Sequence, residues 1–176
     1  VIMLLALWCY QPKAVARQAA VLTVFDVGQG LSILIQTHSH AMLYDTGEQS
    51  FYRDLQQNLL ALGVRKLSLL MLSHHDQDHD GNWLNISRYW QVDKILAGQA
   101  RVYVAQHNRP VLSCRAGQAW NWDGVHFELL TLPADGNTSD NDRSCILRII
   151  ADGKAILLVG DLSSKGEAKL VERYAN

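Results

Sequence analysis

The hydrophobic pattern of the first half of the chain predicts short strands, then a helix, then a buried strand. Runs of β-forming residues separated by turn residues predict strands over residues 21–27, 31–37 and 41–44. Apolar residues at helical spacing from Phe51 to Leu62 predict an amphipathic helix, which Gly63 ends. The unbroken apolar run at residues 67–72 is typical of a strand that is buried on both faces.

The second half of the chain contains more predicted strands than helices. The pattern predicts helices over residues 82–90 and 164–174, and strands over residues 93–97, 101–105, 125–132, 145–150 and 155–159. Asp152 and Gly153 predict a tight hairpin between the last two strands. Residues 106–123 are rich in loop-forming residues, and residues 134–143 are predicted to form an exposed loop. Because the helices separate groups of strands, we expect an α/β fold with sheets packed face to face and helices outside.

The N-terminal segment has two interpretations. Residues 1–9 are almost wholly apolar, but a membrane-spanning helix needs roughly 20 such residues. The segment also lacks the leading positive charges and the cleavage site of a signal peptide. It is either the end of a transmembrane helix over residues 1–10, with Trp8 and Tyr10 at the membrane interface, or a buried first strand or helix. Residues 11–19 are then a polar linker to one domain over residues 20–176.

Composition and charge narrow the class of protein. A chain of 176 residues is long enough for one domain with its own core. The net charge of -1 excludes DNA binding through overall basic charge, so any such contact requires a local patch or bound metal ions. The three cysteines, Cys9, Cys114 and Cys145, lack the spacing of a zinc knuckle, and their odd number indicates no disulfide framework. Cys145 lies in an apolar run and is predicted to pack as a small hydrophobic residue.

The strongest chemical signal is a cluster of candidate metal ligands directly after the predicted strand at residues 67–72. His74, Asp76, Asp78 and His79 offer imidazole and carboxylate groups at the end of a buried strand, where sites of α/β proteins form. These groups suit divalent metals, and two nearby ions can share one such loop. A solvated polar loop with helix-capping aspartates is the alternative interpretation. The concentration of histidine in this short segment favours the metal site.

The same segment carries a family resemblance. Residues 73–82, SHHDQDHDGN, resemble the His-x-His-x-Asp-His metal motif of the metallo-β-lactamase superfamily, with Asp76 in place of the second histidine. The further segments are FDVGQG at 25–30, LYDTG at 43–47, NDRSC at 141–145 and LVGD at 158–161. Their order resembles the C-terminal domain of the ComEC/Rec2 competence proteins, which are integral membrane channels for DNA uptake. The resemblance covers about residues 21–161.

The resemblance implies a metallo-β-lactamase-like αββα sandwich and a set of metal ligands. His74 and Asp76 would bind one metal ion. Asp78 and His79 would bind the second, and Asp78 would also take a proton from the attacking water. Asp161 would bridge the two ions. Without the resemblance, Asp161 could equally be a cap of the last helix.

Further residues are assigned supporting roles by the same resemblance. Asp26 and Asp45 would orient loops and ligands. Asn141 and Ser144 would support the site or contact substrate. His75 replaces a proline of the family pattern and would point away from the metals. Without the resemblance, Asp45 would be read as part of an ordinary turn at a strand end.

Two divalent metal ions are the expected cofactors. The carboxylate of Asp76 in place of an imidazole makes the site harder, which favours manganese, with zinc as the alternative. No histidine follows His126, although a complete site of this superfamily needs a later one. We therefore expect the domain to be truncated at its C-terminus, without its final metal-binding loop.

The resemblance implies a nuclease domain that degrades one strand of incoming DNA. Its expected partners are single-stranded DNA, the membrane channel portion of the same protein and other DNA-uptake components. Its expected place is the outer, periplasmic face of the bacterial inner membrane. Two alternatives remain open, a non-catalytic module that positions DNA in the channel and a superfamily hydrolase that acts on another ester, a thioester or a lactam.

Overall fold

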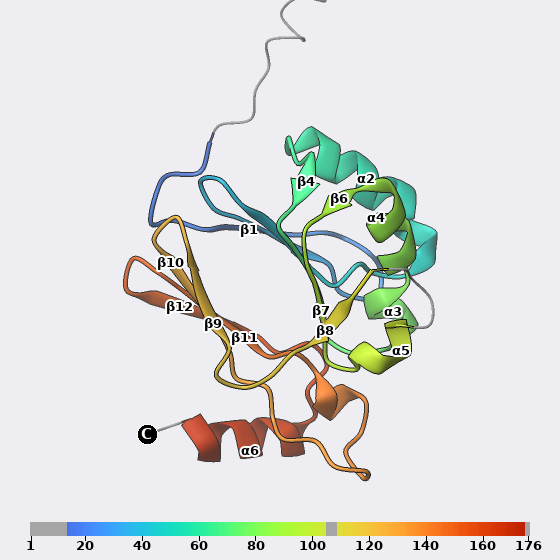
Figure 1. Ribbon diagram of the computed structural model, residues 1–176, viewed down its shortest axis with the longest axis vertical. Helices are drawn as coiled ribbons and strands as arrows, with labels where there is room; N and C mark the ends of the chain where they lie inside the picture. The colour runs from blue at the N-terminus through green and yellow to red at the C-terminus, as the bar shows by residue number, and fades with distance from the viewer. Residues whose placement is uncertain (1–13, 105–108, 175–176) are drawn as a thin grey trace, which may run out of the picture.

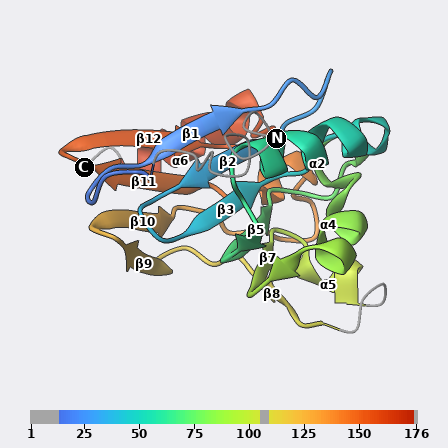
Figure 2. The ribbon, with the colours of Figure 1, turned by 90° about the horizontal axis from the view of Figure 1, so that it is seen from above.

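Two β-sheets packed face to face form the centre of the protein in the computed structural model, which describes residues 14–104 and 109–174. Most helices lie outside the larger sheet, and the last helix lies outside the smaller one (Figure 1). Seen from above, the helices at residues 52–61, 83–89 and 100–104 lie on the side of the larger sheet that faces away from the smaller sheet (Figure 2). The four layers of helix, sheet, sheet and helix confirm the predicted αββα arrangement.

The larger sheet changes from antiparallel to parallel pairing along its width. Its strands, in spatial order, are β1 (Val21–Val24), β2 (Ile33–Gln36), β3 (Ala41–Tyr44), β5 (Leu69–Leu72), β7 (Ile95–Ala97) and β8 (Val111–Ser113). The first three pair antiparallel, and β3, β5, β7 and β8 pair parallel. The carboxyl ends of these four strands therefore meet at one edge of the sheet, where ligand sites of such sheets form.

The smaller sheet is a run of antiparallel hairpins. Its strands, in spatial order, are β12 (Lys154–Leu158), β11 (Leu147–Ala151), β10 (Val125–Leu129) and β9 (Ala119–Trp122). Asp152 and Gly153 both adopt positive φ, 48° and 70°, as the predicted tight turn between β11 and β12 requires. A separate parallel pair joins β4 (Lys66–Leu67) to β6 (Gln91–Val92).

Short helices follow the strand ends. They are η1 (Gln49–Phe51), α2 (Tyr52–Ala61), α3 (Gln77–Asp80), α4 (Trp83–Tyr89), α5 (Ala100–Val104), η2 (Asn141–Arg143) and α6 (Ser164–Tyr174). The α2 helix buries Leu55 and Leu59 one turn apart, and Gly63, with φ 74°, follows its end as predicted.

The hydrophobic core lies on both faces of the larger sheet because side chains alternate along each strand. On β3, Leu43 faces the helices, while Met42 and Tyr44 face the smaller sheet. Phe127 and Leu129 of β10, in the smaller sheet, belong to the same buried cluster as Met42 and Tyr44. Each such fully buried side chain contributes roughly 2 kcal/mol of hydrophobic stabilisation.

The strand predicted over residues 101–105 is wrong, because residues Ala100–Val104 form α5. Val102 and Val104 suggested a strand through their β-branched side chains. In the structure these two residues are exposed, whereas Ala100 and Tyr103 are buried at helical spacing. The segment 106–123, predicted to be rich in loops, contains β8 and β9.

The prediction about cysteine is also wrong, because Cys114 and Cys145 form a disulfide with a Cα–Cα distance of 5.7 Å. An odd total of cysteines does not prevent one pair from meeting. Cys114 follows β8 of the larger sheet and Cys145 precedes β11 of the smaller one, so the bond joins the two sheets through the core.

The predictions for the N-terminal segment are tested only in part. Residues 1–10 lie outside the described residues, and residues 14–19 of the predicted linker contain no helix or strand. Within the described residues, no helix combines the length and apolar character that crossing a membrane requires.

Candidate metal centre

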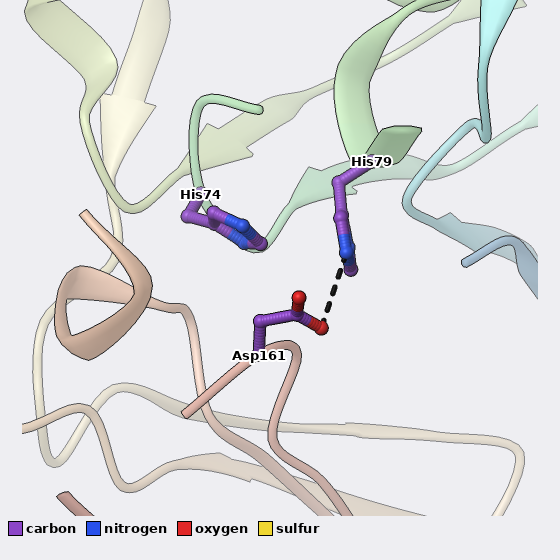
Figure 3. Close-up of side chains that lie close together, drawn as sticks. All are labelled: His74, His79 and Asp161. Atoms are coloured by element: carbon purple, nitrogen blue, oxygen red, sulfur yellow. Dashed lines mark ion pairs between the residues drawn. The ribbon is translucent and has the colours of Figure 1, made fainter. Parts of the chain in front are cut away.

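Three side chains from distant parts of the chain point toward one another at the carboxyl edge of the larger sheet (Figure 3). His74 follows β5, His79 lies on α3, and Asp161 follows β12. One ligand atom of each lies within 4.8 Å of the others. His79 Nε2 is 3.2 Å from Asp161 Oδ1. Both histidines are buried and Asp161 is half-exposed, so the group opens to solvent on the carboxylate side.

His74 has an unsatisfied ligand atom. Its Nδ1 lies 2.9 Å from Ser73 Oγ, while its buried Nε2 has no hydrogen-bond partner among the described residues. Because Ser73 Oγ donates to Asp45 Oδ2, it accepts from His74 Nδ1–H, and the Nε2 lone pair faces the group. A buried, unpaired polar atom costs about 1–3 kcal/mol. A metal ion at this position would remove that cost, so the residues present fit a metal.

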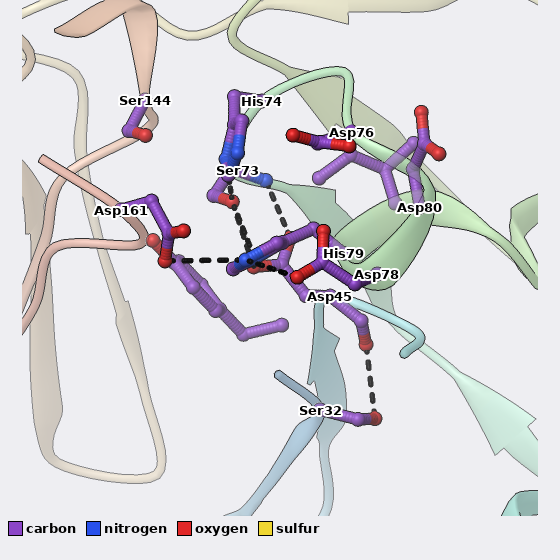
Figure 4. Close-up of polar contacts among 12 residues, drawn as sticks. Ser32, Asp45, Ser73, His74, Asp76, Asp78, His79, Asp80, Ser144 and Asp161 are labelled. Carbon is purple, nitrogen blue, oxygen red and sulfur yellow. Dashed lines mark hydrogen bonds and ion pairs between the residues drawn. The ribbon is translucent and has the colours of Figure 1, made fainter. Parts of the chain in front are cut away.

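Asp45 fixes the orientation of both histidines (Figure 4). It directly follows β3, has φ 59° and is fully buried. Its Oδ1 accepts a hydrogen bond from Ser73 N at 2.6 Å, and its Oδ2 accepts from Ser73 Oγ at 2.7 Å and lies 2.9 Å from His79 Nδ1. A carboxylate on the second ring nitrogen orients a metal-binding histidine. That Asp45 orients the metal ligands stays a prediction, and these contacts support it.

The pKa values of the two histidines are shifted in opposite directions. Burial lowers the pKa of His74, and the nearby charge of His79 lowers it further. Burial also acts to lower the pKa of His79, but the hydrogen bond and charge of Asp45, together with the charges of Asp161 and Asp78, raise it to about 9. Near neutral pH His74 is therefore ready to bind a metal, whereas His79 must first release a proton.

The remaining predicted ligands lie beside this group. Asp78 Oδ2 is 4.0 Å from His79 Nε2, and its side chain is one-third exposed. Asp76 is exposed and caps α3 through a hydrogen bond from Gln77 N to its Oδ1. Its negative charge also acts to raise the pKa of His74. The structure thus groups His74 and His79 with the distant Asp161, with two carboxylates nearby.

The predicted supporting residues lie at different distances from the group. Ser144 is buried, and its Oγ would lie 2.9 Å from a Cβ added at Gly160, directly before Asp161. Its Oγ also donates to the backbone oxygen of Asn141, the first residue of η2. Asp26 is exposed, and its Oδ1 accepts a hydrogen bond from Gly28 N in the turn after β1. No contact among the described residues joins Asp26 to the three grouped ligands.

Sequence reasoning missed Ser73, which is buried and contacts both Asp45 and His74. Its position between the buried strand and the first histidine was the available signal. Thr46 and Asn82 were also missed. Thr46 Oγ1 donates to His79 O and accepts from Asn82 N, so together they attach α3 to the loop after β3.

His75 points away from the grouped ligands, as predicted. Its Nδ1 lies 2.5 Å from Oδ2 of Asp80, a buried carboxylate that also accepts a hydrogen bond from Tyr103. The ring of His75 packs edge-on against Tyr103.

Comparison with protein families and known proteins shows which proteins this chain resembles. The family model of the metallo-beta-lactamase superfamily matches residues 25–175. The chain is 42% identical over 175 residues to "Competence protein ComA" of Neisseria gonorrhoeae, covering 99% of this chain and 24% of that protein. It is 31% identical to "Recombination protein 2" of Haemophilus influenzae, covering 88% of this chain and 20% of that protein. The chain thus spans about a quarter or less of the length of these relatives.

Solved structures support the fold. A metallo-β-lactamase of Cronobacter sakazakii matches with a TM-score of 0.61 and 20% identity over 98% of this chain and 70% of that one. The native FEZ-1 metallo-β-lactamase of Legionella gormanii matches with a TM-score of 0.58 and 19% identity over 87% of this chain and 65% of that one. At these identities the likeness shows the fold alone.

Proposed function

The chain belongs to the metallo-beta-lactamase superfamily, and from this premise we propose that it is the metal-dependent nuclease domain of a DNA-uptake channel. Its homology to part of competence and recombination proteins supports a role in DNA uptake. The observation that carries the hydrolase proposal is the buried Nε2 of His74, which has no hydrogen-bond partner among the described residues and faces His79 and Asp161.

The proposed cofactors are two divalent metal ions. His74, His79 and Asp161 would be ligands, and Asp76 and Asp78 would supply further carboxylates. The excess of carboxylate over imidazole favours manganese, with zinc as the alternative. Such ions supply Lewis-acid activation of water and neutralise the charge on a phosphodiester.

The chain's own residues then do three things. Asp45 holds His79 and, through Ser73, His74 in fixed orientations, so that each presents Nε2 to the site. Asp78 is exposed enough to meet solvent and would accept the proton of the attacking water. Ser144, beside the Asp161 turn, would support the site from the segment between η2 and β11.

The disulfide supports the proposed location. Disulfides persist in oxidising compartments, and the bacterial periplasm is one of them. The bond between Cys114 and Cys145 is therefore consistent with a domain at the outer face of the inner membrane, beside the channel portion and other DNA-uptake components.

A non-catalytic module that positions DNA in the channel is the second candidate. The grouping of one carboxylate with two histidines favours it, because two catalytic ions need more ligands than these three.

Cleavage of single-stranded DNA with manganese separates the two candidates. The assay uses the chain and a version that continues past Asn176, with Asp78→Ala and, as a control on the exposed face of α2, Asp54→Ala. We expect cleavage that Asp78→Ala abolishes and Asp54→Ala leaves unchanged. A folded, metal-loaded protein that leaves the DNA intact would select the positioning module.

A further inference from the structure

A polar groove of about 430 Å³ lies next to the candidate metal centre. One wall is α5, which follows β7, and another is the segment around η2, which leads to β11 (Figure 1). His75, between His74 and Asp76 in sequence, contributes to the lining. The groove therefore begins at the loop that carries the candidate metal ligands.

Hydrogen bonds and close packing attach the groove walls to that loop. The backbone N of His75 donates to Gln99 Oε1 at 2.6 Å, which ties the loop to the start of α5. The buried Asp80 side chain holds His75 and also accepts from Tyr103 OH on α5 at 2.7 Å. Gly98 packs so closely that an added Cβ would lie 2.2 Å from Arg143 O and 2.4 Å from Ser73 O. These contacts hold the groove in a fixed position relative to the loop that carries the candidate metal ligands.

The groove is locally basic although the protein as a whole is not. Arg101 and Arg143 line it, and among its described lining residues only Asp140 carries a carboxylate. Arg143 is held in place, since its Nε donates to Thr138 O at 3.0 Å and its Nη2 donates to Asp135 O. Asp140 is two-thirds exposed and 4.0 Å from Arg143 Nε, so it neutralises little of this charge.

Arg101 supplies the second guanidinium of the groove. It is exposed on α5 and makes no ion pair within the part of the chain that the structure describes. A planar guanidinium fork matches the geometry of a phosphate, and a groove with positive charge can follow the backbone of a single strand. The overall charge of -1 makes it unfavourable for such a strand to bind elsewhere through charge alone.

We propose that this groove binds the phosphodiester backbone of single-stranded DNA beside the metal centre and so positions the strand for cleavage. The inference rests on the proposed function for its ligand, and it names Arg101 and Arg143 as phosphate contacts. Asp140 is the unfavourable group in the groove. Its removal should therefore strengthen binding, which damage to the fold would not do.

The test is fluorescence anisotropy of a fluorescein-labelled oligothymidylate with the chelator-treated chain at several salt concentrations. The variants are Arg101→Ala and Asp140→Asn. Arg53→Ala and Asp54→Asn on α2 make the same charge changes on exposed positions outside the groove. Circular dichroism melts check that each variant is folded.

We expect Arg101→Ala to weaken binding by roughly threefold to tenfold and to reduce the salt slope by about 0.7, the value for one lost phosphate contact on a single strand. Asp140→Asn should tighten binding, and both α2 variants should match the unmodified chain. Equal effects of the groove and α2 variants, or no measurable binding by the unmodified chain, would overturn the proposal.

Cleavage by the manganese-loaded chain distinguishes the two proposals. Groove-dependent binding without cleavage would leave the groove in place and reject the nuclease. Cleavage whose KM is unchanged by Arg101→Ala and by Asp140→Asn would keep the nuclease and reject the groove.

Discussion

Loss of the disulfide between Cys114 and Cys145 should destabilise the protein strongly and locally. The bond is buried between the two sheets, close to the candidate metal centre. Cys145 N donates to Ser73 O at 2.8 Å, and Tyr44 OH donates to Cys145 O at 2.7 Å. Without the bond, these two hydrogen bonds would have to hold the segment before β11 beside Ser73, which orients His74.

The expected loss of stability follows from the length of the loop that the disulfide closes. The two cysteines are 31 residues apart in sequence. In the chain-entropy account, a loop of this length removes enough freedom from the unfolded chain to stabilise the fold by ~3.7 kcal/mol at 25 °C. This is a large fraction of the roughly 5–15 kcal/mol that holds a typical domain folded.

Urea unfolding of the metal-free protein measures this effect. The unmodified chain is compared with and without reductant, and with Cys114→Ala/Cys145→Ala, all in a Cys9→Ser background so that no third thiol can exchange. We expect the oxidised form to be more stable by ~3.7 kcal/mol and the reduced form to resemble the double variant. An unfolding midpoint that reductant leaves unchanged, with both thiols shown to be reduced, would refute the reasoning.

Three further predictions concern the metal centre and the loops around it. Asp45→Asn should lower metal affinity about 10- to 100-fold, measured by calorimetric titration, because one amide oxygen cannot replace both carboxylate oxygens that hold Ser73 and His79. Because the pKa of His79 is raised to about 9, its contribution to metal-free stability should be complete below its ordinary pKa of about 6.5 and lost as pH rises through 9. Metal affinity should increase over the same interval, and an affinity independent of pH between these values would contradict this assignment. Gly30→Ala should destabilise the fold by about 2 kcal/mol in urea unfolding, since its Cβ would lie 1.7 Å from Asp78 O. Equal stability of that variant and the unmodified chain would show that the loop can move aside.

Sequence patterns predicted the layers because the strongest signals were local. The apolar run before Ser73 contains a buried strand, the helix over Ser164–Tyr174 has the predicted bounds, and β3 spans Ala41–Tyr44 as predicted. These elements form because their apolar side chains become buried, and the spacing of apolar residues along the sequence shows which side chains those are.

The features that the sequence did not reveal depend on contacts between distant segments. The disulfide brings together β8 and β11, which lie in different sheets, and no local pattern encodes their approach. The α5 helix is short enough that burial of Tyr103 against Asp80, rather than helix propensity, determines it. Asp161 was placed with the histidines by family resemblance, because nothing local separates a ligand from a helix cap.

Metal binding by the three grouped residues tests the central claim most directly. Manganese is titrated into the chelator-treated protein by calorimetry, with zinc in a parallel experiment, for the unmodified chain, His74→Ala and the control Asp54→Asn. The account predicts saturable binding that His74→Ala weakens by at least about tenfold and that Asp54→Asn leaves unchanged. Equal binding by His74→Ala and the unmodified chain, or no binding by the folded protein, would contradict the claim that this group is a metal centre.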